Sequence, residues 1–252
     1  KLFPVEISAQ LTEIAGDEVM VIVLRDIPKR KADEEAIKRQ LNELTALHRV
    51  AEVGTQHEKE DPIIDVALTS IEAILQPDFH GILFLTPDQK QLNFHPASPN
   101  VPPDFQGNPI PVGAGIIGEV ASSGAAQYYP DVSTVPHYLE IVPDTRSELC
   151  VPIKSQKHIL GVINIESNQT DAFTPGDQRF LQTLAGQLGT SMERTRLFNT
   201  VKRQLGRLQS LRTIDRAISG SLDINVSMNI ILNQITDIES DLREFLVGKL
   251  KT

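Results

Sequence analysis

The sequence predicts an α+β protein in which a compact domain with an antiparallel sheet is flanked by long amphipathic helices. Three observations support this prediction. A helical segment occurs twice, at residues 39–50 and again at residues 203–214. Between the two copies, segments of strand-forming residues are joined mostly by short turns, which is typical of antiparallel sheets. Helical segments lie before and after these strands, so we expect helices to pack on one face of the sheet.

The expected elements follow in order along the chain. Two strand-forming segments near the N-terminus, joined by a turn at residues 15–18, predict a hairpin. A helix enters through Pro28, because proline is favoured in a first helical turn. Inside the central domain we expect a helix from Asp61, a short helix at 113–124 and a final helix opening at Thr174. The strands of the central domain are expected at 81–85, 91–94, 127–129, 147–153 and 159–166.

Both copies of the repeated helix carry a narrow apolar stripe. Its members are Ile37, Leu41, Leu44, Leu47 and Val50 in the first copy, and Val201, Leu205, Leu208, Leu211, Ile214 and Ile218 in the second. The two copies depart from a strict heptad at the same place. Such a stripe is buried either against its own domain or against the identical helix of a second copy. We predict the second arrangement, a parallel homodimer, and keep the first as the alternative.

Composition restricts the partners. The chain has 252 residues and a formal net charge of −9, and its basic residues do not cluster apart from acidic ones. Nucleic acid and anionic membranes are therefore not expected as partners. No apolar run is long enough to span a bilayer and no signal peptide is recognised, so we expect a cytoplasmic location. The single cysteine, Cys150, excludes an internal disulfide and a zinc site built on paired cysteines, and we expect no metal.

Several motifs of the central domain occur in the order typical of one family. Together they resemble a GAF domain over residues 61–198. They are the glycine-bounded segment 113–124, Tyr128-Tyr129-Pro130-Asp131, the strand 147–153, the strand 160–167 and Ala172-Phe173-Thr174-Pro175-Gly176-Asp177. The resemblance implies a six-stranded antiparallel sheet and a sensor of small molecules or chromophores.

The flanking segments resemble parts of other sensory modules. Residues 1–30 are similar to the C-terminal end of a PAS domain, and the segment from Ser210 onward resembles the start of a second GAF domain. The resulting division places a PAS fragment at 1–30, a connector helix at 31–60, the GAF domain at 61–198, a second connector at 199–219, and a truncated GAF-like unit or helical tail at 220–252.

The GAF resemblance places a ligand between the sheet and the helix and loops that follow the second strand. All three tyrosines of the chain fall in this region, and a ring with a polar tip suits a pocket wall. The predicted ligand-binding residues are Ile116, Tyr128, Tyr129, Asp131, Tyr138, Arg146, Glu148 and Cys150. Under the alternative these residues only fix a long loop. The ligand and any cofactor are unknown at this stage.

Three other signals have a simpler structural explanation. Residues 113–118 match the glycine pattern of a dinucleotide site, but no buried parallel strand precedes them, so we expect tight turns at a short helix. His57 lies in a segment similar to a phospho-accepting box, and we expect a solvated linker there. Cys150 lies in an apolar strand, which indicates a buried thiol and not a reactive one.

No constellation typical of catalysis is apparent, so we expect no enzyme. The carboxylates of Asp131, Asp144, Glu148 and Glu166 lack ligand spacing, and we interpret them as loop caps or solvated groups. By family resemblance, methionine sulfoxide reductases of this type need several cysteines. The residue set of cyclic-nucleotide-binding members is only partly matched, by Asn164, Phe173 and Asp177 without the lysine.

The resulting prediction is a sensory and regulatory signalling module of the two-component type. A small molecule bound in the GAF pocket would change the relative pose of the connector helices in a parallel homodimer, and the helices would relay that change to an output domain beyond this chain. The alternative is a constitutive dimerisation spacer whose GAF unit binds nothing.

Overall fold

The computed structural model describes residues 5–14, 17–26, 28–56, 59–136, 138–156, 158–220, 232–233 and 235–236. The chain divides into two units, Lys1–Glu193 and Arg194–Thr252. Among the helices described, none is long and apolar enough to cross a membrane. His57 and most of the predicted second GAF-like unit at 220–252 lie outside the described residues.

The first unit begins with a hairpin of β1 (Val5–Ile14) and β2 (Asp17–Asp26), which pair in antiparallel register. The predicted hairpin is therefore confirmed, with a longer first strand than expected. Several of its apolar side chains are exposed, among them Ile7, Met20 and Ile22. Its assignment to a PAS domain stays a prediction.

The central sheet consists of β3 (Phe79–Leu85), β4 (Gln91–Phe94), β5 (Ile110–Pro111), β6 (Gln127–Tyr129), β7 (Ser147–Ser155) and β8 (His158–Ser167). Its strand order is β5-β4-β3-β8-β7-β6, and all neighbouring strands are antiparallel. The predicted α+β class with a six-stranded antiparallel sheet is confirmed. The two-residue β5 is not among the five strands that the sequence predicts.

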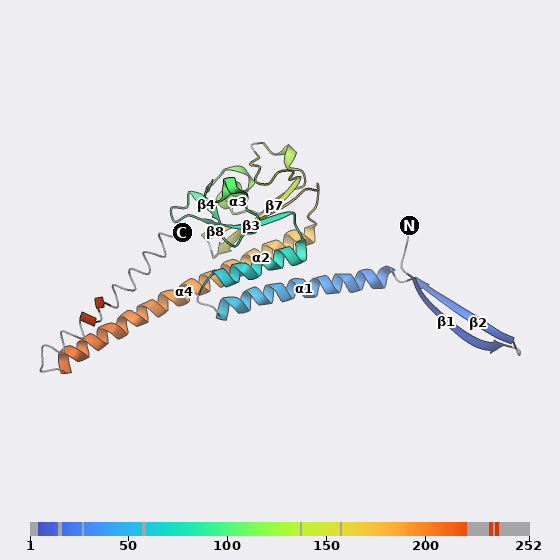
Figure 1. Cartoon of the computed structure of the whole chain (residues 1–252), viewed down its shortest axis with the longest axis horizontal. Helices are drawn as coiled ribbons and strands as arrows, with labels where there is room; N and C mark the ends of the chain where they lie inside the picture. The colour runs from blue at the N-terminus through green and yellow to red at the C-terminus, as the bar shows by residue number, and fades with distance from the viewer. Residues whose placement is uncertain are drawn as a thin grey trace. The chain divides into compact units, whose positions relative to one another are not determined.

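Two long helices cover one face of this sheet, α2 (Asp61–Leu75) and the first part of α4 (Pro175–Gly220), and the C-terminal half of α1 (Pro28–Gln56) packs on these two helices (Figure 1). Side chains alternate along a strand, so every second residue of β7 and β8 enters this core. The inward residues include Leu149, Val151, Ile153, Ile163 and Ile165, and they pack against Ile63, Ile64, Ile71, Leu181, Leu184 and Leu188 of the helices. Gly54 allows close helix packing, since a Cβ there would lie 2.6 Å from the Cβ of Ser191.

The opposite face is covered by the short helix α3 (Gly115–Ser123) and by loops that contain the single-turn helices η1 (Pro103–Phe105) and η2 (Val132–Thr134). Buried residues of α3, including Ile116, Ile117 and Val120, pack on Leu83, Leu92 and Val162 of the sheet. The space between α3 and β7–β8 is the region in which a ligand was expected.

The apolar stripe of α1 is divided between two environments. Ala46 and Val50 are buried against the domain, whereas Ile37, Leu41 and Leu44 are 61–65% exposed. In the second unit, the described part of the α4 stripe is exposed at Val201, Leu205, Leu208 and Leu211. The C-terminal half of α1 thus packs on its own domain, and these exposed stripe residues of α1 and α4 are available to a partner. The homodimer itself stays a prediction.

Candidate functional site

Two glutamates face each other in the middle of the sheet. Glu148 on β7 pairs directly with Glu166 on β8, and the two residues are 2% and 1% exposed. Both side chains project toward α3, because the alternate positions Leu149 and Ile165 enter the core beneath the long helices. Like charges directly opposite on one sheet face are destabilising, so this pair needs a physical explanation.

The pair holds its protons more tightly than exposed carboxyls do. Burial, together with the nearby Glu166, raises the pKa of Glu148 well above its ordinary value. Burial likewise raises the pKa of Glu166 to about 7, although Thr145 Oγ1 and Asn164 Nδ2 donate hydrogen bonds to its two oxygens at 2.6 and 2.9 Å. Within the described part of the chain, neither glutamate has a basic partner. The pair therefore retains a proton near neutral pH.

Two further polar atoms beside the glutamates are incompletely bonded. The Tyr138 hydroxyl and Asn164 Oδ1 are buried, and among the described residues neither makes a hydrogen bond of good geometry, although Tyr138 interacts with Glu148 and Thr145. Burial raises the pKa of the Tyr138 hydroxyl, and the charges of Glu148 and Glu166 raise it further. Buried polar atoms are nearly always paired in folded proteins. The unused hydrogen-bonding capacity of this cluster indicates a place for a polar ligand.

A small cavity, too narrow in this structure to hold a water molecule, lies between Glu148 and the N-terminal turn of α3. It is lined by Ala114, Gly115, Ile116, Ile117, Leu139, Ile141 and Glu148. Gly115 has a φ of +57°, and a Cβ there would lie 2.8 Å from that of Leu139. The first N–H groups of a helix have no partner within the helix and attract negative charge. The end of the cavity at the N-terminal turn of α3 thus suits an anionic group, and the end at Glu148 suits a cationic one.

Four of the predicted ligand-binding residues gather here. Ile116 and Glu148 line the cavity, and Tyr138 lies near Glu148. Cys150 lies two residues after Glu148 on the same face, opposite Asn164, and is fully buried, as the strand pattern predicted. Burial raises the pKa of the Cys150 thiol well above its ordinary value, and both glutamates add to this effect.

The other predicted residues have structural contacts. Tyr128 does not face the cavity; its ring lies edge-on to that of Phe173 on the side of the long helices, with centroids 6.2 Å apart. Tyr129 packs on the α3 side and lies opposite Glu148 in the strand pairing. Asp131 caps η2, and its Oδ2 lies 3.7 Å from a guanidinium nitrogen of Arg146, which is exposed.

The two glutamates were interpreted wrongly from the sequence, and one residue that contacts Glu166 was not identified as part of the site. Glu148 and Glu166 were interpreted as loop caps or solvated groups, which is wrong because both are buried. Thr145 was not singled out at all. A signal was present in the alternation: polar Glu148 and Cys150, and polar Asn164 and Glu166, occupy every second position of two otherwise apolar strands.

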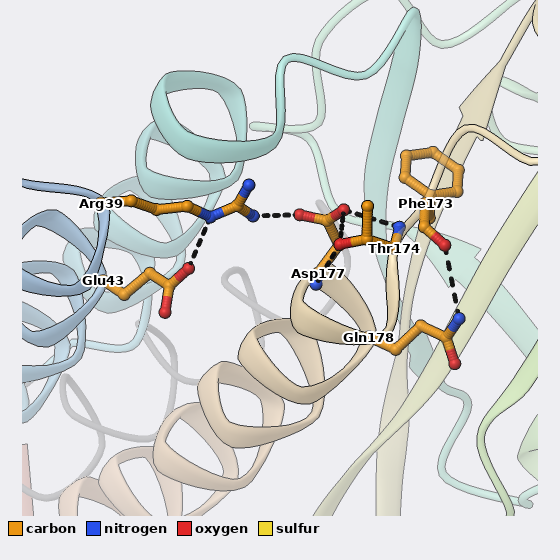
Figure 2. Close-up of polar contacts among 6 residues, drawn as sticks. All are labelled: Arg39, Glu43, Phe173, Thr174, Asp177 and Gln178. Carbon is orange, nitrogen blue, oxygen red and sulfur yellow. Dashed lines mark hydrogen bonds and ion pairs between the residues drawn. The ribbon is translucent and has the colours of Figure 1, made fainter. Parts of the chain in front are cut away.

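Two other motifs have structural roles. The glycine pattern at 113–118 includes the first turn of α3, and the sheet beside it is antiparallel. The parallel strand and crossover of a dinucleotide site are therefore not formed here. Gly118 is required by close packing, since a Cβ would lie 2.5 Å from the carbonyl oxygen of Pro111. Asp177 caps α4 and contacts Arg39, while Phe173 is buried in the core, so these two residues do not join Asn164 in one site (Figure 2).

A larger cleft of about 540 Å³ lies on the α2 side of the sheet. Its most buried polar side chain is His80, whose Nδ1 lies 3.4 Å from Glu72 Oε2. Burial lowers the pKa of His80 despite the nearby Glu72, so this imidazole is neutral near pH 7. Across the described ranges, no group of three or more His, Cys, Asp or Glu residues could hold a metal ion.

Comparisons with known proteins agree with this architecture. The family model for the GAF domain matches residues 58–193, more than half of the chain. The chain is 32% identical over 142 residues to Protein ZMO0507 of Zymomonas mobilis, which covers 52% of this chain and 83% of that protein. It is 36% identical over 83 residues to the free methionine-R-sulfoxide reductase of Saccharomyces cerevisiae, covering 32% of this chain and 46% of the reductase.

Solved structures include an enzyme of the same kind. The free methionine-R-sulfoxide reductase from Neisseria meningitidis, in complex with its substrate, superimposes with a TM-score of 0.55 at 21% identity, over 64% of this chain and 93% of that one. The expectation that the chain is not an enzyme is therefore contradicted, since its relatives and structural neighbours include reductases built on this fold. The aligned part spans less than half of the yeast reductase.

Proposed function

Because the chain belongs to the GAF domain family, we propose that its central domain binds a compact zwitterion, of the type of a free amino acid, between α3 and β7–β8. The observation that carries the proposal is the buried pair of Glu148 and Glu166 with no basic partner among the described residues. A ligand ammonium group would supply the missing positive charge, and Tyr138 and Asn164 offer incompletely bonded polar atoms beside it.

The carboxylate of the same ligand would lie at the N-terminal turn of α3, whose residues Gly115, Ile116 and Ile117 line the cavity. In this structure the cavity is too narrow to hold even a water molecule. Leu139 and Ile141 close the cavity from the loop before β7, so this loop must move to admit the ligand.

Free L-methionine sulfoxide is the first compound to test, because reductases of this amino acid derivative are among the relatives. We expect calorimetry to detect its binding to the wild-type chain. The matched compound 4-(methylsulfinyl)butanoate lacks only the amino group, so its affinity should be at least tenfold lower. Glu148→Gln should weaken the binding of L-methionine sulfoxide by a similar factor, because a charge-assisted hydrogen bond to the ammonium is lost. Equal affinity for both compounds would contradict the ammonium assignment.

Reduction of the bound sulfoxide is a second candidate function, favoured by the reductase relatives. Cys150 is the single thiol of the chain and lies on the site's face of β7. In this reaction the Cys150 sulfur would take the sulfoxide oxygen as a sulfenic acid while the sulfoxide S–O bond breaks, leaving a thioether. A protonated glutamate would donate a hydrogen bond to that oxygen. Two molecules of an external thiol would then regenerate Cys150, forming a disulfide and water.

Formation of methionine from methionine sulfoxide in the presence of dithiothreitol tests this second candidate. We expect turnover by the wild-type chain and loss of turnover in Cys150→Ser, with binding retained. Turnover that persists in Cys150→Ser would contradict the proposed nucleophile. Binding without turnover in the wild-type chain would leave the domain as a receptor for this ligand.

Signal relay through the helices is the regulatory part of the proposal. The exposed stripes on α1 and α4 support it, because each would be covered by the identical helix of a second copy in a parallel dimer. A ligand biases such a relay only as far as it binds one pose of the helices more tightly than the other. A domain that binds no ligand would instead act as a spacer.

A further inference from the structure

We infer that Arg39 is a positioning residue that couples α1 to β6, the strand that pairs with β7 beside the candidate site, an inference that rests on the proposed function of that site. The Arg39 guanidinium donates to Asp177 at the start of α4 and to Glu43 Oε1 at 3.0 Å (Figure 2). Every side chain from residue 31 to residue 42 is exposed, and Ala46 is the first buried residue of α1 from residue 31 onward. The N-terminal half of α1 is therefore held weakly, and Arg39 is one of its contacts with the domain.

Asp177 ties Arg39 to the first turn of α4. Its Oδ2 accepts hydrogen bonds from the backbone N–H and the hydroxyl of Thr174, at 2.7 and 2.6 Å, while Oδ1 accepts from Arg39 (Figure 2). Burial, the largest influence, acts to raise the pKa of Asp177, but the bonds from Thr174 and Arg39 hold it below its ordinary value. The carboxylate stays ionised, and both of its oxygens are used.

The residue before Thr174 connects this cap to β6. The backbone N–H of Phe173 donates to the Tyr128 hydroxyl at 3.3 Å, and that hydroxyl donates to Asp171 Oδ1 at 3.0 Å. Tyr129, the next residue of β6, lies opposite Glu148 in the strand pairing. A continuous set of contacts thus runs from the buried glutamate through β6 and the cap of α4 to α1.

This arrangement makes the Arg39 contact sensitive to the position of β6. A ligand that shifts β6 moves the Phe173–Thr174 segment, and the Asp177 carboxylate moves with it. The contact can open at low cost because Arg39 is 45% exposed and Asp177 keeps its bonds from Thr174. Coupling between two sites is reciprocal, so a change at Arg39 alters the site as much as the site alters Arg39.

Hydrogen exchange of the α1 amides tests the coupling without any ligand. Arg39→Gln should speed exchange over residues 31–44 by about fivefold or more, the lower end of ordinary coupling between sites. Tyr128→Phe keeps the ring but loses the hydroxyl, and should act in the same direction. In the double variant Arg39→Gln with Tyr128→Phe, α1 exchange should be only slightly faster than in Arg39→Gln alone. It should stay far below the rate expected if the two single effects multiplied. Asp171→Asn, which disturbs the same hydroxyl, serves if Tyr128→Phe does not fold.

Lys38→Gln is the matched control, because it removes the same charge one residue away from Arg39. Exchange that is equally fast in Lys38→Gln, or that is unaffected by both Tyr128→Phe and Asp171→Asn, would overturn the inference. Independent effects that multiply in the double variant would overturn it as well.

Saturating L-methionine sulfoxide provides a separate result. This ligand should change the hydrogen-exchange rate of the α1 amides in the wild-type chain but not in Arg39→Gln. Binding that leaves α1 exchange unchanged would overturn the coupling while the proposed function stands. Absence of binding would count against the proposed function alone, and the ligand-free variants would then decide the coupling.

Discussion

Two carboxyl side chains buried opposite each other are the residue-level feature that most needs explanation. Glu148 and Glu166 lie next to the buried apolar residues Leu149 and Ile165 of the same strands, and a well-packed apolar pair at the two glutamate positions would cost less. The structure lowers the cost by keeping a proton on the pair and by hydrogen bonds from Thr145 and Asn164. Polar groups retained at such a cost are typical of functional sites.

The pair predicts a defined dependence of stability on pH. A carboxyl whose pKa is raised by folding binds protons better in the folded state, so stability falls as pH rises from the unfolded pKa through the folded one. For Glu166 this window runs from about 4.5 to about 7. The corresponding loss of unfolding free energy is at most roughly 3 kcal/mol. Glu166→Gln should therefore be more stable than the wild-type chain at pH 8 and about equally stable at pH 5.

Urea denaturation at the two pH values measures this effect in the absence of ligand. Glu119→Gln is a suitable control, because Glu119 is exposed on α3 and should leave the pH dependence unchanged. The same loss of stability between pH 5 and pH 8 in Glu166→Gln and in the wild-type chain would show that Glu166 is not the titrating group.

At the scale of elements, most strands and helices were predictable, but the pairing that forms the site was not. The segments 81–85, 91–94 and 127–129 were identified from residue type and turn spacing, and the last hairpin was placed nearly correctly. Ser155 pairs with His158, and continuing that register would set Glu148 opposite Ile165. A bulge between Ile153 and Lys154 shifts the pairing by one residue, and Glu148 meets Glu166 instead.

Tertiary contacts determine the register of the strands, and the sequence pattern contains little information about those contacts. The bulge leaves Leu160 of β8 without a pairing partner beside Gly161, and a single glycine in a strand does not fix where the register shifts. Strand β5 has two residues, too few for an alternation to be recognised. The stripe of α1 shows a related limit. Its spacing predicted one continuous apolar face, yet only packing on the domain determines that Val50 is buried while Leu41 is exposed.

At the scale of the whole molecule, the repeated stripe predicts self-association. Leu41 and Leu205 occupy equivalent positions of the two copies, and both are exposed in the single chain. Covering a leucine contributes about 2 kcal/mol, so a charged residue at both positions should weaken a parallel dimer far more than tenfold. We expect sedimentation velocity to show a wild-type dimer at micromolar concentration and a monomer for the double variant Leu41→Lys with Leu205→Lys.

The repeat also supplies the matched control, because glutamine precedes the leucine in both copies. Gln40→Lys with Gln204→Lys adds the same two charges beside the stripe and should leave the dimer intact. Orientation is tested separately with Leu208→Cys in the Cys150→Ser background, since a cysteine near the seam can join its own equivalent along the helix only when the helices run parallel. The parallel dimer would be contradicted if the wild-type chain is a monomer at every concentration, or if the Gln40→Lys with Gln204→Lys variant also dissociates the dimer. The relay would then have to act within one chain.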